Sequence, residues 1–174
     1  SVFRQTGAQV TPGDFLSIRR THGYRYSTKV TRLAMPDYMA DTGEREQISA
    51  ENRKTADRIL QLCRENGAQL LLVELPSVTS WNAARHRGVA EFAAARGLEF
   101  LDLNLLYDQM GLDGAVAFRD AGNHLNVTGA TAVTAYLGRY IALQYRLPDL
   151  RGNSRYANRQ EEWVCYRRFV NGNV

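Results

Sequence analysis

The apolar run at residues 69–76, QLLLVELP, limits the fold of this chain more than any other feature. It is short, rich in Leu and closed by a proline, which is typical of a strand buried on both faces of a parallel sheet. A second run of the same character follows at residues 98–103. Because parallel strands need a crossover connection that is usually a helix, the two runs together predict an α/β fold.

Helical patterns flank both runs. Ser49 has the character of an N-cap, apolar residues recur at helical spacing as far as Cys63, and Asn66-Gly67 follows as a stop signal. A second helix is expected at about residues 82–96 and a third at about 127–145. Helix, strand, helix and strand joined by short links are typical of a doubly wound sheet.

We therefore expect a three-layer α/β/α, flavodoxin-like parallel sheet. Only two buried strands are evident in 174 residues, whereas sheets commonly have about four to six, so the sheet is expected to be incomplete on its N-terminal side. Residues 1–46 are predicted to be an irregular segment, within which residues 24–33 are a short strand or an extended loop. Residues 47–146 are the α/β part, and residues 147–174 form a polar, Arg-rich tail with aromatic residues that packs on the domain.

The charge of the chain is positive but dispersed. Lys and Arg number 22 against 18 acidic residues, for a net charge of +4, and only Lys29 and Lys54 are lysines. The arginines are scattered and often adjoin acids, whereas nucleic-acid binders cluster basic residues on one face. We expect no nucleic-acid partner. No apolar run approaches the roughly 20 residues of a membrane span, so any membrane association would come through a segment that is not in this chain.

The cysteines and two of the histidines give no metal pattern. Cys63 and Cys165 lie far apart, and a bridge between them stays open beside the alternative of free thiols. His22 and His86 have no acid or Cys at ligand spacing, so we expect surface histidines there. We predict neither a metal nor a cofactor.

A chemically distinctive segment lies at residues 118–130. His124 comes four residues after Asp120 and two residues before Asn126, which is expected to cap the following helix, and Gly122 allows a sharp turn. A histidine on such a turn, with a carboxylate to fix its tautomer, has the base and orienting acid of a hydrolytic triad. A His124 that only hydrogen-bonds its own loop is the alternative.

The pattern Asp-x-x-x-His-Leu-Asn-x-x-Gly-Ala over residues 120–130 resembles the last motif block of SGNH (GDSL-like) hydrolases, and more narrowly their DltD- and AlgX-like bacterial members. The resemblance extends over residues 47–156, with residues 70–76 similar to the penultimate core strand and residues 98–104 to the final one. It implies that His124 is the general base and Asp120 its orienting acid. It also implies acyl transfer through a serine ester, without metal or cofactor.

Two departures from the family pattern bear on this interpretation. The family's acid lies three residues before the histidine, where this chain has Ala121, so Gly122 and Asn123 must absorb one extra residue. The Gly-x-Ser nucleophile turn and the oxyanion donors of the family are not evident. Ser17 echoes the nucleophile block only superficially, since no buried strand precedes it.

Polar residues after the first strand are candidates for the cleft, because ligands bind outside the carboxyl ends of parallel strands. Trp81 beside Asn82 could stack on a sugar ring, although a partly buried wall is the alternative for Trp81. With Asn123, these two residues are the candidate substrate-binding residues. Ser77 and Ser80 could also line the cleft, and Asp102, at the end of the second strand, is expected to cap Asn104 or the turn that follows.

Two functions follow from the sequence as hypotheses. The first is an SGNH-like esterase or O-acyltransferase that acts on an acylated small molecule or a cell-surface glycan, with the serine supplied by a segment outside this chain. The second is a non-catalytic remnant or a glycan- or protein-binding module on the same scaffold. The resemblance implies an extracytoplasmic or membrane-associated location.

Overall fold

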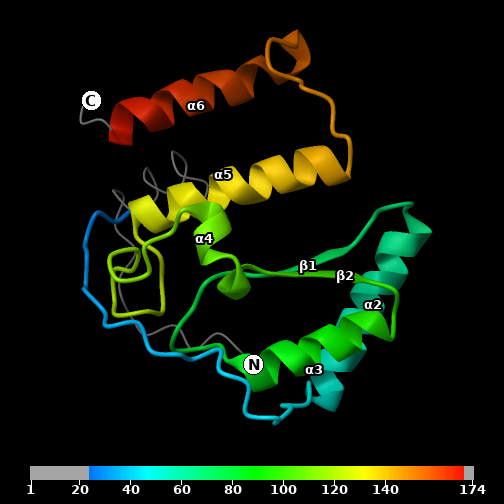
Figure 1. The fold of residues 1–174 in the computed structure, drawn as a ribbon. Coiled ribbons are helices and arrows are strands. Elements are labelled where there is room, and N and C mark those ends of the chain that lie inside the picture. Colours follow the sequence, from blue (N-terminus) through cyan, green and yellow to red (C-terminus); the bar gives the residue numbers. More distant parts are fainter. Residues whose placement is uncertain (1–23, 171–174) are drawn as a thin grey trace, which may run out of the picture. The chain divides into compact units, whose positions relative to one another are not determined.

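The structure, a computed structural model, describes residues 24–170 of the chain. It divides into two compact units, of which one is Ser27–Ile141 and the other comprises Ser1–Tyr26 with Ala142–Val174. The elements, in chain order, are α2 (Ala50–Glu65), β1 (Leu71–Glu74), α3 (Ala83–Ala94), β2 (Glu99–Asp102), the 3-10 turn η1 (Leu103–Leu105), α4 (Tyr107–Met110), α5 (Val127–Gln144), η2 (Ser154–Tyr156) and α6 (Ala157–Val170) (Figure 1).

The two strands form a parallel sheet, as the sequence predicts. Their register runs from Leu71 opposite Glu99 to Glu74 opposite Asp102. The burial expected for β1 is wrong for the described residues, because all four of its residues are only half-buried. Within the described chain β1 pairs with β2 alone, so its other edge lacks the neighbouring strand that a strand interior to a parallel sheet would have. The chain is thus a mixed α/β protein with a short two-stranded sheet.

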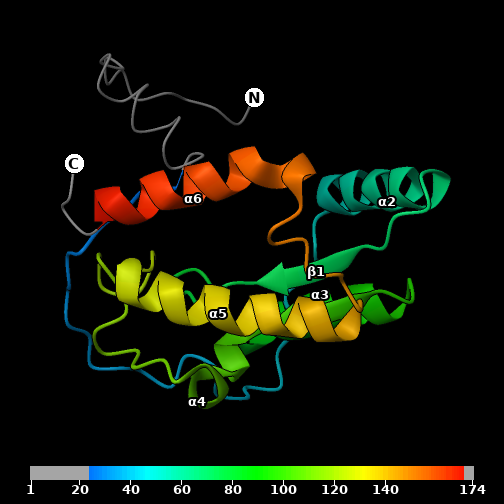
Figure 2. The same ribbon diagram turned by 90° about the horizontal axis from the view of Figure 1, so that it is seen from above.

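Helices α5 and α3 contact opposite faces of this sheet. Side chains alternate along a strand, and Leu71, Val73 and Leu101 lie on the face that packs against Val133 and its neighbours in α5. Phe100 points to the other face, where aromatic residues at the start of α3 contact it. Figure 1 shows α5 and α3 on either side of the strands, and Figure 2 shows α5 running along β1.

Several predicted helix ends are confirmed. The Ser49 side chain accepts a hydrogen bond from the Asn52 N–H at the start of α2, and Gly67 adopts a left-handed conformation after its end. The Asn126 amide oxygen accepts the Gly129 N–H at 3.1 Å in the first turn of α5. Asn126 is 1% exposed, so this cap also anchors the helix start inside the protein.

Residues 24–46 contain neither helix nor strand, and they lie against later parts of the chain. The N–H groups of Thr31 and Leu33 donate to the carbonyls of Phe118 and Ala115, at 2.9 and 3.1 Å. The segment between residues 24 and 33 is therefore an extended loop, which was one of the two predicted alternatives.

Residues 41–47 are fastened along α3 by charge. Arg45 pairs with Glu91 at 2.5 Å, and Glu46 pairs with Arg85 at 2.9 Å. The Glu46 N–H also donates to a backbone carbonyl of α3 at 3.0 Å. The Glu46 carbonyl lies so close to Gly88 that a Cβ there would overlap it. Only glycine permits this approach.

The described part of the second unit is mainly the helix α6, which the sequence analysis did not predict. Its rings of Trp163 and Tyr166 stack with centroids 5.8 Å apart, although Trp163 is largely exposed. Of the two cysteines, Cys165 in α6 is exposed and Cys63 in α2 is half-buried, and both are free thiols.

Gly88→Ala should destabilise the protein by about 1–3 kcal/mol, because the segment at Glu46 must move to admit the methyl group. Gly138→Ala is the matched control, since Gly138 lies inside α5 with nothing within 4 Å of a Cβ. Helix propensity alone should make that control more stable by up to about 1 kcal/mol. Urea unfolding measures both, and equal effects at the two positions would contradict the close contact.

Candidate functional site

The loop that carries His124 is closed at its base by backbone pairing. Phe118 and Leu125 form an antiparallel bridge, and the Arg119 N–H donates to the His124 carbonyl at 3.0 Å. Phe118 is fully buried, so the base of the loop is anchored in the core. Of the residues between, Gly122 is buried and the others are exposed or half-exposed, which is the arrangement of a surface loop on a rigid support.

The loop has one residue more between Asp120 and His124 than the SGNH pattern, and two residues with positive φ accommodate it. Ala121 has φ 59° and Gly122 has φ 108°. The left-handed region costs an L-residue such as alanine roughly 1–2 kcal/mol, so the loop holds some strain at Ala121. A Cβ on Gly122 would lie 2.8 Å from the Val78 side chain. The predicted role of Gly122 in the sharp turn is confirmed.

Asp120 holds His124 at two points. Its Oδ1 accepts the His124 backbone N–H at 2.7 Å, and its Oδ2 lies 2.5 Å from the ring Nδ1. An ionised carboxylate can only accept, so Nδ1 carries the proton in this contact and Nε2 of the neutral ring is left as the basic nitrogen. The structure thus brings together the two residues that the sequence predicts as base and orienting acid.

The environment of Asp120 favours its charged form. Partial desolvation is the largest influence and acts to raise its pKa, but the hydrogen bonds from the backbone and ring of His124, its charge and the N–H of Asn123 together outweigh it. The pKa of Asp120 is therefore lowered. The carboxylate stays ionised throughout the pH range in which an imidazole normally titrates.

No serine among the described residues hydrogen-bonds the His124 ring. Asn123 lies beside both groups: its amide nitrogen is 3.2 Å from Nδ1 of His124, and its Oδ1 accepts the Ser80 hydroxyl at 2.7 Å. With the proton on Nδ1, the first of these contacts joins two donors and is not a hydrogen bond. The backbone reinforces this contact between loops, because the Val78 N–H donates to the Gly122 carbonyl at 2.7 Å. Asn123, predicted as a binding residue, therefore lies between His124 and the β1–α3 loop.

Trp81 and Asn82 both have structural partners. The Asn82 side chain caps α3 by accepting the Arg85 N–H at 2.9 Å. The Trp81 indole N–H donates to Asp102 Oδ2 at 2.8 Å, and its ring packs edge-on against Phe100. This arrangement matches the partly buried wall that was the alternative for Trp81, and substrate binding by either residue stays a prediction.

A second His–Asp pair lies beside Trp81, and the sequence analysis missed it. His86 Nδ1 lies 2.7 Å from Asp102 Oδ2, and the His86 side chain is 28% exposed while that of Asp102 is 2% exposed. Trp81 and His86 occupy the positions just before the cap and one turn into α3, which commonly pack together at helix starts. The spacing of Trp81 and His86 about the Asn82 cap was the sequence signal for this contact. The expectation that His86 is a surface histidine is wrong, because its side chain is half-buried.

Asp102 also fixes the turn after β2. Its Oδ1 accepts the backbone and side-chain N–H groups of Asn104, at 2.9 and 2.8 Å, which confirms the predicted cap. Asn104 Oδ1 in turn accepts the Ser77 N–H and the Tyr38 hydroxyl, both at 2.9 Å. Burial and the neighbouring Tyr107 raise the pKa of Tyr38. One buried network thus joins three loops at the carboxyl edge of the sheet.

Glu74 ends β1 directly opposite Asp102 in the parallel register. Desolvation by burial is the main cause that raises the pKa of Glu74, and the negative charge of Asp102 adds to it. Because two negative charges on adjacent strands repel each other, the ionised form of Glu74 is disfavoured beside Asp102.

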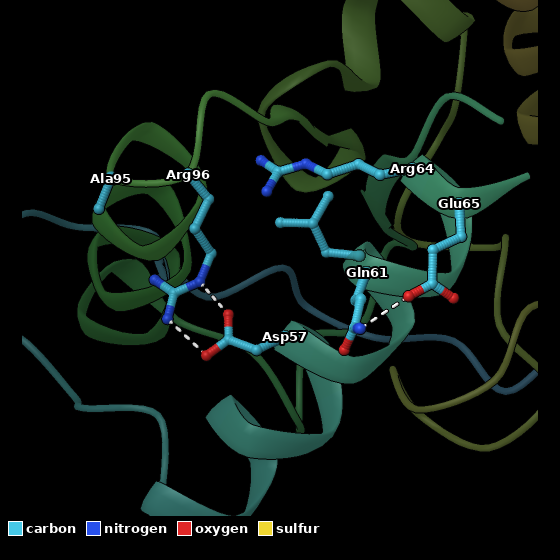
Figure 3. Close-up of a pocket in the computed structure, with 7 residues that line it drawn as sticks. Asp57, Gln61, Arg64, Glu65, Ala95 and Arg96 are labelled. Atoms are coloured by element: carbon cyan, nitrogen blue, oxygen red, sulfur yellow. Dashed lines mark hydrogen bonds and ion pairs between the residues drawn. The ribbon is translucent and has the colours of Figure 1, made fainter. Parts of the chain in front are cut away.

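An open hollow lies between α2 and the end of α3, and Figure 3 shows its lining side chains. Arg96 binds the Asp57 carboxylate through two nitrogens, at 2.5 and 3.0 Å, and this contact lowers the pKa of Asp57. Gln61 donates to Glu65 at 2.7 Å on the other side. Both carboxylates of the hollow, Asp57 and Glu65, therefore have hydrogen-bond partners within it.

Comparisons with known proteins give no assignment. No protein-family model, no characterised protein and no solved structure matches the chain. Within residues 24–170, no group of three His, Cys, Asp or Glu side chains is placed to hold a metal ion. None of the helices in that part of the chain is long and apolar enough to span a membrane.

Asp102→Ala should lower the free energy of unfolding by about 3 kcal/mol, because it leaves buried donors of Trp81, His86 and Asn104 without an acceptor. Asp108→Ala, at an exposed position in α4, is the control and should change stability by no more than about 0.5 kcal/mol. Urea unfolding followed by tryptophan fluorescence measures both. A loss below about 1 kcal/mol for Asp102→Ala would show that the network does not hold the loops.

Proposed function

We propose that the chain is the base-bearing part of an SGNH-like ester hydrolase or O-acyltransferase. The observation that carries the proposal is the contact of Asp120 Oδ2 with Nδ1 of His124 at 2.5 Å, with the other carboxylate oxygen held by the His124 backbone N–H. This contact fixes the tautomer in which Nε2 can take a proton from a serine hydroxyl. The exposed ring of His124 leaves that nitrogen open to substrate.

In the proposed reaction, His124 Nε2 takes the proton of a serine hydroxyl as its oxygen attacks an acyl ester carbonyl. The same proton then passes to the departing alcohol, which leaves an acyl-serine ester. Water, or the hydroxyl of a glycan, repeats the sequence in reverse and carries the acyl group away. Asp120 stabilises the imidazolium that forms in each half of the cycle.

The finer features of fold and location belong to the same proposal. Two parallel strands with a helix on each face are consistent with the three-layer, flavodoxin-like sheet of SGNH hydrolases. The half-buried β1, with one edge unpaired in the described chain, supports a larger sheet of which these strands are the later part. The proposed substrates are an acylated small molecule or a surface glycan. The proposed location is extracytoplasmic or membrane-associated.

A non-catalytic binding module is the second candidate. One observation favours it: among the described residues no serine hydroxyl is hydrogen-bonded to the His124 ring. A scaffold that keeps the His–Asp pair only to shape its loop would show this geometry. The exposed Asn123 and His124 would then contact a glycan or a partner protein directly.

The protein should hydrolyse a short-chain p-nitrophenyl ester, and His124→Ala should abolish this activity. Asp120→Asn should lower kcat by about 10³–10⁴-fold, because the neutral amide no longer selects the Nδ1–H tautomer. Asp113→Asn is the matched control, since Asp113 is an exposed loop carboxylate that accepts the Ala115 N–H. Activity that survives His124→Ala would refute the hydrolase, and a complete lack of activity would favour the binding module.

A further inference from the structure

A serine of the β1–α3 loop hydrogen-bonds the residue next to the proposed base. Of the three described serines outside this loop, Ser49 caps α2, the Ser27 hydroxyl accepts the Lys29 N–H, and Ser154 lies in η2. Ser77 is buried and its hydroxyl accepts the Ser80 N–H at 3.3 Å. Ser80 alone among the described serines has a hydroxyl that contacts the residues 120–124, through Asn123 Oδ1 at 2.7 Å.

We infer that Ser80 is the nucleophile that His124 activates, an assignment that rests on the proposed function. Ser80 follows β1 and precedes α3, so it lies outside the carboxyl end of a parallel strand, where ligands bind in open α/β sheets. The sequence predicted only that Ser80 could line the cleft. The structure adds the contact with the residue next to His124.

The backbone at Ser80 is anchored while its hydroxyl is exposed. The Ser80 N–H donates to Ser77 Oγ, and the Ser80 carbonyl accepts a hydrogen bond from the Arg85 guanidinium. The Val78 N–H bonds the Gly122 carbonyl and so joins the β1–α3 loop to the loop of His124. The two loops pack so closely there that a Cβ on Gly122 would overlap the Val78 side chain. A serine on a fixed backbone between a strand and a helix is the arrangement that presents nucleophiles in other hydrolases.

The proposed mechanism includes a change of the Ser80 rotamer, because the observed hydroxyl bonds Asn123 and not His124. The Ser80 hydroxyl now donates to Asn123 Oδ1, and exposed side chains change rotamer within nanoseconds. Catalytic hydrogen bonds are often formed only once substrate is bound. In the proposed mechanism the Ser80 hydroxyl leaves Asn123 Oδ1 and donates to Nε2 of His124.

The chemical step conserves atoms and charge. Ser80 Oγ forms a bond to the acyl carbon, its proton moves to His124 Nε2, and the ester C–O bond breaks. The departing alkoxide takes that proton and leaves as an alcohol. Water then attacks the acyl-Ser80 ester, gives a proton to His124, and the carboxylic acid departs as Ser80 regains the proton.

A fluorophosphonate probe tests the assignment on the full chain. Attack by Ser80 forms an Oγ–P bond and expels fluoride, while His124 takes the hydroxyl proton, so the adduct is stable and its site can be read by peptide mass spectrometry. We expect one label per chain, on the peptide that contains Ser80. Labelling should disappear in Ser80→Ala and slow at least about 100-fold in His124→Ala.

Ser27→Ala is the matched control and should label at the rate of the parent chain. Ser17→Ala tests the competing sequence candidate, which lies outside the described residues, and should also leave labelling unchanged. Ser80 is exposed, so Ser80→Ala should keep the melting temperature and the circular dichroism spectrum of the parent chain. Its p-nitrophenyl ester hydrolysis should fall to the level of His124→Ala.

The outcomes separate the two proposals. A His124-dependent label on any serine other than Ser80 would overturn the present inference and leave the hydrolase intact. The absence of both label and ester hydrolysis would overturn both. A label on Ser80 that His124→Ala leaves unchanged would also contradict the inference, because the hydroxyl would then react without the proposed base.

Discussion

The buried carboxylate of Asp102 is the contact on which the arrangement of the loops depends. It accepts four hydrogen bonds, from Trp81, His86 and both nitrogens of Asn104, where β2 ends. A buried charge is stable only when it is paired and its lone pairs are satisfied. Because those donors come from the β1–α3 loop, from α3 and from the turn after β2, one side chain sets their spacing. The loop of His124 is then docked on that frame through the contact of Gly122 with Val78.

The elements of the α/β part could be predicted from local signals. Ser49 and Gly67 mark the ends of α2 by capping chemistry, and the apolar run at residues 69–76 contains β1. What could not be predicted depends on distant partners. Residues 41–47 can lie along α3 because Gly88 leaves room for the Glu46 carbonyl. No local sequence pattern predicts this contact. Helix α6 was missed because its polar composition has no clear apolar face.

The site shows the same division. The spacing of Asp120 and His124 predicted a contact that the structure contains, since a tight turn can return the chain over so short a distance. His86 and Asp102 lie far apart in the sequence, and their pairing follows from the packing of α3 on β2. The contact of Ser80 with Asn123 likewise joins loops that only the fold brings together. Contacts between residues close in sequence could therefore be predicted, whereas contacts between distant segments at the sheet edge required the tertiary structure.

The claim on which the proposed function depends is that Asp120 fixes the tautomer of His124. Long-range ¹H–¹⁵N correlation spectra of the ¹⁵N-labelled protein, recorded with the ring neutral, report which nitrogen carries the proton. We expect the neutral His124 ring to be protonated at Nδ1 with Nε2 free, and Asp120→Ala to remove this preference, because the Asp120 carboxylate accepts the Nδ1 proton. A neutral ring protonated at Nε2 in the parent chain would contradict the account, because that nitrogen could not then act as the base.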